Sequence, residues 1–377
     1  MAEIHERGFD LAHPPLLQVT LFRTAEEAHA LLFTIHHIIA DGWSTGVLFS
    51  ELFAAAEKSD GELLQFRDYV RWLEGRDWKG ALAYWRQLLA GAERSELPGR
   101  RLRGEEEAYR GESCPLDLAE ETEQALREAA GRCRVTLNAV LQAAWGLVLS
   151  RCCLKKDLLF GEVVAGRPAE LPGVEGMIGL CANTVPVRLR MSGEESFADL
   201  ACRVQADAAR AADHVFVSLG DIQAGLGKGG KELLSHFFVL ENYPPPRAEN
   251  GLQVAVAEEF SRTSFDFAVV WEQQERLAGR LVYNAAAFQP WQVESLGAAY
   301  RTVLEAVGRD YRAPLASLDL VPADQKRLLR EFQGKSFPCP ETTLVDLFRE
   351  TASRQPEAVA LICRGEALTY ADLDRRS

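Results

Sequence analysis

His36-His37-Ile38-Ile39-Ala40-Asp41-Gly42 is the stretch of sequence that decides the fold. It follows an apolar run, residues 31–35, that is typical of a buried strand, and it leads into a tight turn at Asp41-Gly42. Beyond the turn, apolar residues recur at helical spacing, and Ser44 is placed to cap that helix. A strand, an imidazole, a turn and a helix in this order hold a general base on rigid backbone. The pattern therefore favours a catalytic histidine over a structural pair.

Further motifs follow along the chain in a fixed order. They are an aromatic helical segment at 66–72, a Gly-Arg-Pro turn at 166–168, a Gly-x-x-x-Asn-Thr-x-x-x-Arg motif at 179–188, and a Glu-Asn-Tyr-Pro strand end at 241–244. Together with His-His-x-x-x-Asp-Gly, this series resembles the condensation domains of nonribosomal peptide synthetases, over about residues 8–320. An ordered series of motifs is far more specific than any one of them.

The resemblance implies a fold and a reaction. The fold is α/β, with two lobes like those of chloramphenicol acetyltransferase, mixed sheets, and the histidine motif between the lobes. The reaction is amide-bond formation between an acyl or peptidyl thioester donor and an aminoacyl thioester acceptor, a step in antibiotic biosynthesis. Both substrates are carried on the 4'-phosphopantetheine arms of partner proteins, an upstream donor carrier and a downstream acceptor carrier. The chain itself is expected to bind no cofactor.

The two histidines receive different roles. The resemblance gives His37 the catalytic position, and Gly42 lets the backbone pass close to the imidazole or the substrate. Because successive strand residues point to opposite faces, both histidines cannot face one cleft, so we expect a buried structural role for His36. Asp41 has two interpretations: it orients His37, as a triad carboxylate does, or, as the resemblance implies, it forms an ion pair with Arg188 that fixes the loop.

Three further residues are candidates for contact with substrate. Trp43 is expected either to narrow the entry of a carrier arm or to pack in the core. Ser44 is expected to cap its helix rather than act as a nucleophile, because no Gly-x-Ser-x-Gly elbow surrounds it. Asn242 ends an apolar strand, where its amide can meet a substrate or simply form a turn before Tyr243-Pro244.

Composition limits the other possibilities. The chain has 377 residues and a net charge of −13, which argues against binding nucleic acid through phosphates. Its first residues lack the apolar core of a signal peptide, and no apolar run is long enough to span a membrane. The eight cysteines include no Cys-x-x-Cys pair, so neither a zinc site nor a redox pair is indicated. These features predict a cytoplasmic protein.

The element pattern alternates helices and strands. Helices are predicted near 43–57, 62–90, 119–133, 137–152, 196–213 and 290–307, and strands near 16–22, 30–36, 157–165, 179–190, 235–241, 252–258, 265–272 and 279–285.

Four parts are predicted along the chain: residues 1–111, the remainder of an N-terminal lobe and a crossover; 112–313, a C-terminal lobe; 314–341, a linker; and 342–377. The last part resembles the start of an adenylation domain, including its Leu-Thr-Tyr-x-x-Leu motif at 368–373. Family members carry about a hundred more residues before Gly8, the size of a missing half-domain. We therefore expect an incomplete N-terminal lobe and weak or absent activity of this chain alone.

Two other functions compete with condensation. One is an acyltransferase of the same fold that uses a hydroxyl acceptor, and the adenylation-like tail argues against it. The other is a silent module that only docks carrier proteins, and the intact His37, Asp41 and Gly42 argue against it.

Overall fold

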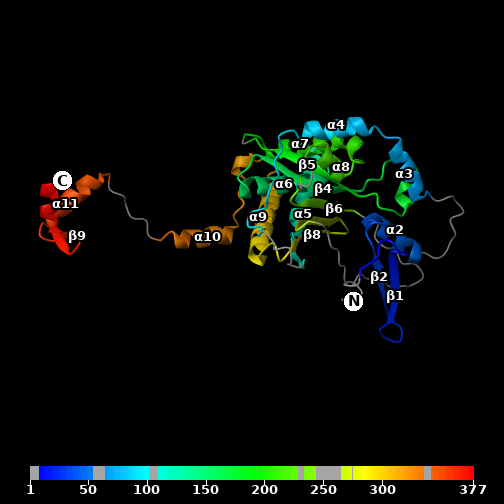
Figure 1. Cartoon of the computed structure of the whole chain (residues 1–377), viewed down its shortest axis with the longest axis horizontal. Helices are drawn as coiled ribbons and strands as arrows, with labels where there is room; N and C mark the ends of the chain where they lie inside the picture. The colour runs from blue at the N-terminus through cyan, green and yellow to red at the C-terminus, as the bar shows by residue number, and fades with distance from the viewer. Residues whose placement is uncertain are drawn as a thin grey trace. The chain divides into compact units, whose positions relative to one another are not determined.

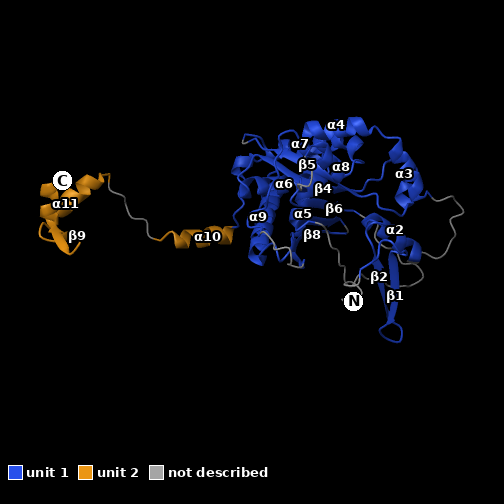
Figure 2. Cartoon of the chain, viewed as in Figure 1, with its two compact units in different colours: residues 1–322 blue, residues 323–377 orange. Residues whose placement is uncertain are grey.

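The computed structural model describes residues 8–53, 64–101, 109–192, 194–227, 233–242, 265–273, 275–334 and 341–377. The chain divides into two compact units, residues 1–322 and 323–377, which are coloured blue and orange in Figure 2. The larger unit holds the histidine motif. The predicted strand at 252–258 lies outside the described residues.

A six-stranded sheet forms the centre of the larger unit. Its strands lie in the order β3-β8-β7-β6-β4-β5. β6 is parallel to both β4 and β7, and the other neighbours are antiparallel, so the sheet is mixed, as predicted. The strands are β3 (Gly111–Pro115), β4 (Asp157–Val164), β5 (Asn183–Arg190), β6 (Phe237–Glu241), β7 (Phe267–Gln273) and β8 (Leu277–Asn284).

Four helices pack with this sheet around the main apolar core (Figure 1). They are α5 (Glu120–Cys133), α6 (Leu137–Cys152), α7 (Phe197–Ala211) and α9 (Pro290–Arg309). α6 is apolar almost all round, and eleven consecutive residues from Ala139 to Leu149 are buried, as expected for a central helix. Its N-cap is Thr136, whose hydroxyl accepts from the Ala139 amide.

The histidine motif lies in a smaller N-terminal part. Here β1 (Leu17–Arg23) and β2 (His29–Ile35) form a two-stranded antiparallel sheet, followed by α2 (Gly42–Phe53). In β1 the apolar side chains of Val19 and Leu21 are exposed, at 48% and 65% of their surface. The incomplete N-terminal lobe stays a prediction. Helices α3 (Phe66–Glu74), α4 (Trp78–Leu88) and α8 (Leu219–Gly225) complete the described helices of this unit; short 3₁₀ turns occur at 174–176, 212–214 and 315–317.

The smaller unit contains α10 (Ala323–Phe332), α11 (Leu344–Arg354), β9 (Val359–Cys363), β10 (Glu366–Thr369) and α12 (Tyr370–Arg376). From residue 343 onward the chain therefore follows the order helix, strand, turn, strand, helix. α10 was not predicted, because the prolines around residues 314–341 suggested a linker without regular structure. Between those prolines, however, 323–332 consists mostly of strong helix formers.

A buried histidine joins three segments of the larger unit. His236 has no exposed surface, and its Nε2 accepts from the Trp145 indole nitrogen at 3.0 Å. Because the indole can only donate, the neutral ring carries its proton on Nδ1, which lies 2.8 Å from the Ser235 hydroxyl. That hydroxyl in turn donates to the Ser95 carbonyl. Burial, together with nearby Arg94, lowers the pKa of His236 to about 3.

The larger unit should therefore lose stability in mild acid. Between pH 6.5 and about 3 the unfolded chain protonates His236 and the folded chain does not, so stability falls as pH falls. The slope from this one group is about 1.4 kcal/mol per pH unit at most. Denaturant unfolding at pH 4.5 to 7 measures it. His236→Gln, which can still accept from Trp145, should flatten the slope. An equal slope in both proteins would contradict the assignment.

Candidate active site

The turn after β2 is built around His36. The His36 amide donates to the Leu16 carbonyl at 2.9 Å, continuing the pairing with β1, and its carbonyl accepts from Ile39 at 3.1 Å. The ring Nδ1 accepts from the Ile38 amide at 3.1 Å, and the ring meets Phe9 edge-on. His36 is half-buried rather than buried as expected, and its backbone and ring both bond within the turn. A purely structural role for it stays a prediction.

His37 is the exposed residue of the pair and begins the turn 37–39. Within the described part of the chain, no other residue forms a hydrogen bond with its ring. The imidazole is therefore presented on a fixed backbone without a carboxylate partner among these residues. Such a ring can exchange a proton with a bound group or hydrogen-bond to it.

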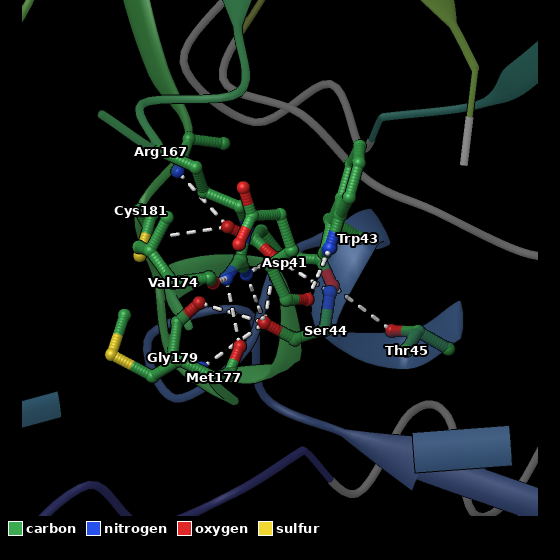
Figure 3. A network of polar contacts seen from close by, with 11 residues as sticks. Asp41, Trp43, Ser44, Thr45, Arg167, Val174, Met177, Gly179 and Cys181 are labelled. Atoms are coloured by element: carbon green, nitrogen blue, oxygen red, sulfur yellow. Dashed lines mark hydrogen bonds and ion pairs between the residues drawn. The ribbon is translucent and has the colours of Figure 1, made fainter. Parts of the chain in front are cut away.

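Asp41 is the most heavily bonded residue of the motif (Figure 3). Only 3% exposed, its Oδ1 accepts from the amide and hydroxyl of Ser44 at 2.8 and 2.7 Å. Its Oδ2 accepts from the amides of Cys181 and Ala182 at 2.9 and 3.0 Å. The Arg167 guanidinium completes the set, 3.1 Å from Oδ1. Both oxygens are used, so the triad-like role in orienting His37 is not what the structure shows.

The electrostatics of Asp41 follow from these contacts. Burial alone would raise the pKa of the carboxyl. The hydrogen bonds from Ser44, the charge of Arg167 and the Cys181 amide outweigh burial and hold the pKa below its usual range. The residue is therefore a carboxylate at neutral pH, and its charge is paired inside the protein.

Arg167 connects the motif to residues 174–182, which we call the latch loop. Its guanidinium donates to the carbonyls of Val174 and Met177 at 2.6 and 2.8 Å, and to the Ser44 hydroxyl at 2.9 Å. The preceding Gly166 has a φ of +62°, and a Cβ there would lie 1.8 Å from the Cys181 carbonyl oxygen. Only glycine permits this approach. The sequence marked Gly-Arg-Pro as a turn and missed the role of its arginine.

The predicted ion pair between Asp41 and Arg188 is wrong. Arg188 binds Asp157 through two hydrogen bonds of 2.8 and 2.6 Å. It also donates to the carbonyls of Leu88 and Ala90, at 2.7 and 2.8 Å, at the C-terminal end of α4. Those carbonyls have no partner within the helix, so the guanidinium supplies their hydrogen bonds. Its positive charge also interacts favourably with the negative end of the helix dipole. Sequence order alone did not distinguish the two arginines.

Two other predictions change. Asp41, not Ser44, caps α2, because the helix begins at Gly42, so that the Ser44 amide is the third in the helix. Ser44 is fully buried, and its hydroxyl lies 2.8 Å from the Gly179 carbonyl and 3.0 Å from the Gly179 amide. The Trp43 indole donates to the Glu175 carbonyl at 2.8 Å. Both side chains therefore hold the latch loop, and direct contact with substrate stays a prediction.

Gly42 and Asn242 lie where the sequence suggested, but their roles stay predictions. Gly42 is the half-buried first residue of α2, and Asn242 is exposed just beyond β6. Among the described residues, no group of three His, Cys, Asp or Glu side chains is arranged to hold a metal ion. No helix in this part of the chain is long and apolar enough to cross a membrane.

Comparisons with known proteins agree with this geometry. A model of the condensation domain family matches residues 1–330. The chain is 31% identical over 395 residues to bacitracin synthase 1 of Bacillus licheniformis; the match covers all of this chain and 8% of the synthase. Among solved structures, the X-domain from teicoplanin biosynthesis has a TM-score of 0.74 at 27% identity, covering 85% of this chain and 78% of that one. The X-domain in a complex of the X-domain and OxyB, also from teicoplanin biosynthesis, has a TM-score of 0.70 at 26% identity. That match covers 86% of this chain and 77% of the other.

The mixed sheet, the histidine turn and these matches define one class of protein. The chain belongs to the condensation domain family. It spans about a twelfth of the synthase that it matches.

Asp41 and Arg167 should behave as one unit in a double-mutant cycle. Asp41→Asn and Arg167→Ala each leave a buried charge without its partner, so each should lower the free energy of unfolding by about 3 kcal/mol. The double variant should lose clearly less than the sum. Arg188→Ala supplies the control. When it is combined with Asp41→Asn, the two losses in unfolding free energy should add to within about 0.5 kcal/mol, because Arg188 does not contact Asp41. Coupling of Asp41 to Arg188 instead of Arg167 would contradict the structure.

The His36 turn can be tested with two near-isosteric substitutions. His36→Asn keeps an acceptor close to the position of Nδ1, so it should preserve the hydrogen bond from Ile38 and most activity. His36→Gln puts its acceptor nearer to Nε2 and should behave like His36→Ala, with a loss of about 1 kcal/mol of stability. Thermal unfolding and turnover measure the difference. Equal losses in the Asn and Gln variants would show that the bond to Ile38 is unimportant.

Proposed function

We propose that this domain joins a carrier-bound acyl or peptidyl thioester to the amine of a carrier-bound aminoacyl thioester, and that His37 acts on the attacking amine. The observation that carries the proposal is the exposed imidazole of His37, at the start of a turn that is followed closely by the buried, hydrogen-bonded Asp41. Family membership supports the same reaction.

The reaction does not require His37 to be a strong base. The amine nitrogen attacks the donor carbonyl, a C–N bond forms, the C–S bond breaks, and the donor carrier keeps the released thiol. One proton must leave the amine and one must reach the thiolate. An α-amino group has a pKa of about 7.7–8.0, so part of it is already neutral near pH 7. The main contribution of His37 is then to orient the amine and to stabilise the charged intermediate by hydrogen bonding.

Asp41 serves this reaction indirectly. Its two oxygens are occupied by Arg167, Ser44 and the latch loop, so it fixes the backbone that presents His37 and does not polarise the ring. Positional precision of this kind matters, because a displacement of about 1 Å can cost 10²-fold in rate. Gly42, Trp43 and Asn242 are proposed to shape the path of the substrates around the ring.

The partners follow from the reaction. We propose an upstream donor carrier and a downstream acceptor carrier, each bringing its substrate on a 4'-phosphopantetheine arm, in a cytoplasmic synthetase. Residues 342–377 are proposed to begin an adenylation domain. Two facts support this. The match to bacitracin synthase 1 continues past residue 330, where the family model ends. In the segment from α11 to α12, Thr369 of the Leu-Thr-Tyr motif is the N-cap of the last helix, so the motif has a defined place in the fold.

A second candidate is a domain that docks partner proteins without catalysis. One observation favours it: a neighbour at 26% identity is a domain seen in complex with another protein, OxyB. The exposed His37 ring and the complete network around Asp41 favour catalysis instead.

Replacing His37 tests the proposal. In the full-length synthetase, His37→Ala should reduce dipeptide formation by about 10²- to 10⁴-fold, the usual contribution of a positioned proton-transfer group. Thermal stability should be nearly unchanged, because the ring is exposed and unpaired among the described residues. The assay combines donor-loaded and acceptor-loaded carriers and detects the product by mass spectrometry.

Leu154→Ala is the matched control, because it also removes an exposed side chain, 91% accessible, but one outside the histidine turn. It should leave turnover unchanged. Wild-type turnover in His37→Ala would contradict the catalytic role. Carrier binding without any product in the wild-type protein would favour the docking function.

A further inference from the structure

Two cysteines from different helices meet on the larger unit. Cys133 is the last residue of α5, and Cys202 lies in the second turn of α7. The Cys202 sulfur is 3.6 Å from the Cys133 carbonyl oxygen. The neighbouring residues are also tied together, because the amide and hydroxyl of Thr136 donate to Gln205 at 2.9 and 2.8 Å. The two helices are thus held in a fixed relation at this point.

The two thiols differ in environment. Cys202 is exposed, whereas Cys133 is half-buried. Burial raises the pKa of the Cys133 thiol, and the nearby Cys202 sulfur raises it further. Cys202 is therefore the thiol that an oxidant in solution meets first, and Cys133 stands behind it as the second thiol.

We propose that Cys133 and Cys202 form a reversible disulfide that fastens the end of α5 to α7 when the protein meets a small disulfide oxidant. The Cys202 thiolate attacks one sulfur of the oxidant, an S–S bond breaks, and one oxidant thiolate leaves. The Cys133 thiolate then attacks the Cys202 sulfur and expels the second oxidant thiolate. The protein loses two protons and two electrons, and the oxidant is reduced to two thiols.

The bond would link positions 69 residues apart, α5 before the central helix and α7 after strand β5. Closing so long a loop restricts the unfolded chain, which is how a disulfide stabilises a protein. The sequence did not indicate this pair, because its spacing matches no redox motif. By contrast, Cys152 and Cys153 are adjacent in sequence, and the Cys153 sulfur points to the Glu96 carbonyl at 3.2 Å.

The experiment oxidises the whole chain with oxidised glutathione and maps its disulfides. After digestion with trypsin, mass spectrometry should find the peptide 133–134 joined to the peptide 191–203. The oxidised protein should melt about 5 °C higher than the reduced protein, and dithiothreitol should reverse both changes.

Cys133→Ser and Cys202→Ser are the matched variants, and each should lose both the cross-link and the shift in Tm. Cys152→Ser is the control and should keep both. Glutathione attached to Cys202 without a cross-link would overturn the proposal, as would a cross-link confined to Cys152 and Cys153, or no reaction of either Cys133 or Cys202.

Discussion

The buried carboxylate of Asp41 is the interaction on which the site depends. It caps α2, binds two amides of the latch loop and pairs with Arg167, so one side chain joins the histidine turn to the segment between β4 and β5. A buried charge is costly unless it is paired and hydrogen-bonded, and here both conditions are met. The same condition explains why Arg167 is itself buried. Its charge neutralises Asp41, and its Nη1 donates to the carbonyls of Val174 and Met177 in the latch loop.

The residues that hold the site together are different from the residue proposed to act on the substrate. Asp41, Ser44 and Arg167 lie inside the protein and contact one another, whereas His37 is exposed on the preceding turn, residues 37–39. His36 contributes by bonding to the turn rather than to a reacting group. A reaction whose amine is already partly neutral near pH 7 needs positioning more than base strength, and a rigid turn supplies positioning.

Much of the fold followed from local pattern. The strand before His36, the long apolar helix α6 and the strands β4 to β8 of the mixed sheet were predicted from their apolar runs and spacing. The edge strand β3 was not predicted, because its short sequence Gly-Glu-Ser-Cys-Pro is not an apolar run. Long-range pairing was harder to predict. Arg167 and Arg188 both follow or lie in strands that approach the motif, and only the three-dimensional path decides which one reaches Asp41 and which one caps α4. α10 was missed because prolines on either side outweighed a short run of helix-forming residues. The contact of Cys133 with Cys202 likewise has no signature in sequence spacing.

The most direct test of the account is a crystal structure of the domain with a phosphopantetheine arm that carries a stable aminoacyl amide. The account predicts that the amine of this analogue lies within hydrogen-bond distance, about 2.6–3.2 Å, of the His37 ring. It also predicts that Asp41 keeps its bonds to Arg167 and the latch loop. An amine bound away from His37, or Asp41 turned from Arg167 to bond with the His37 ring, would contradict it.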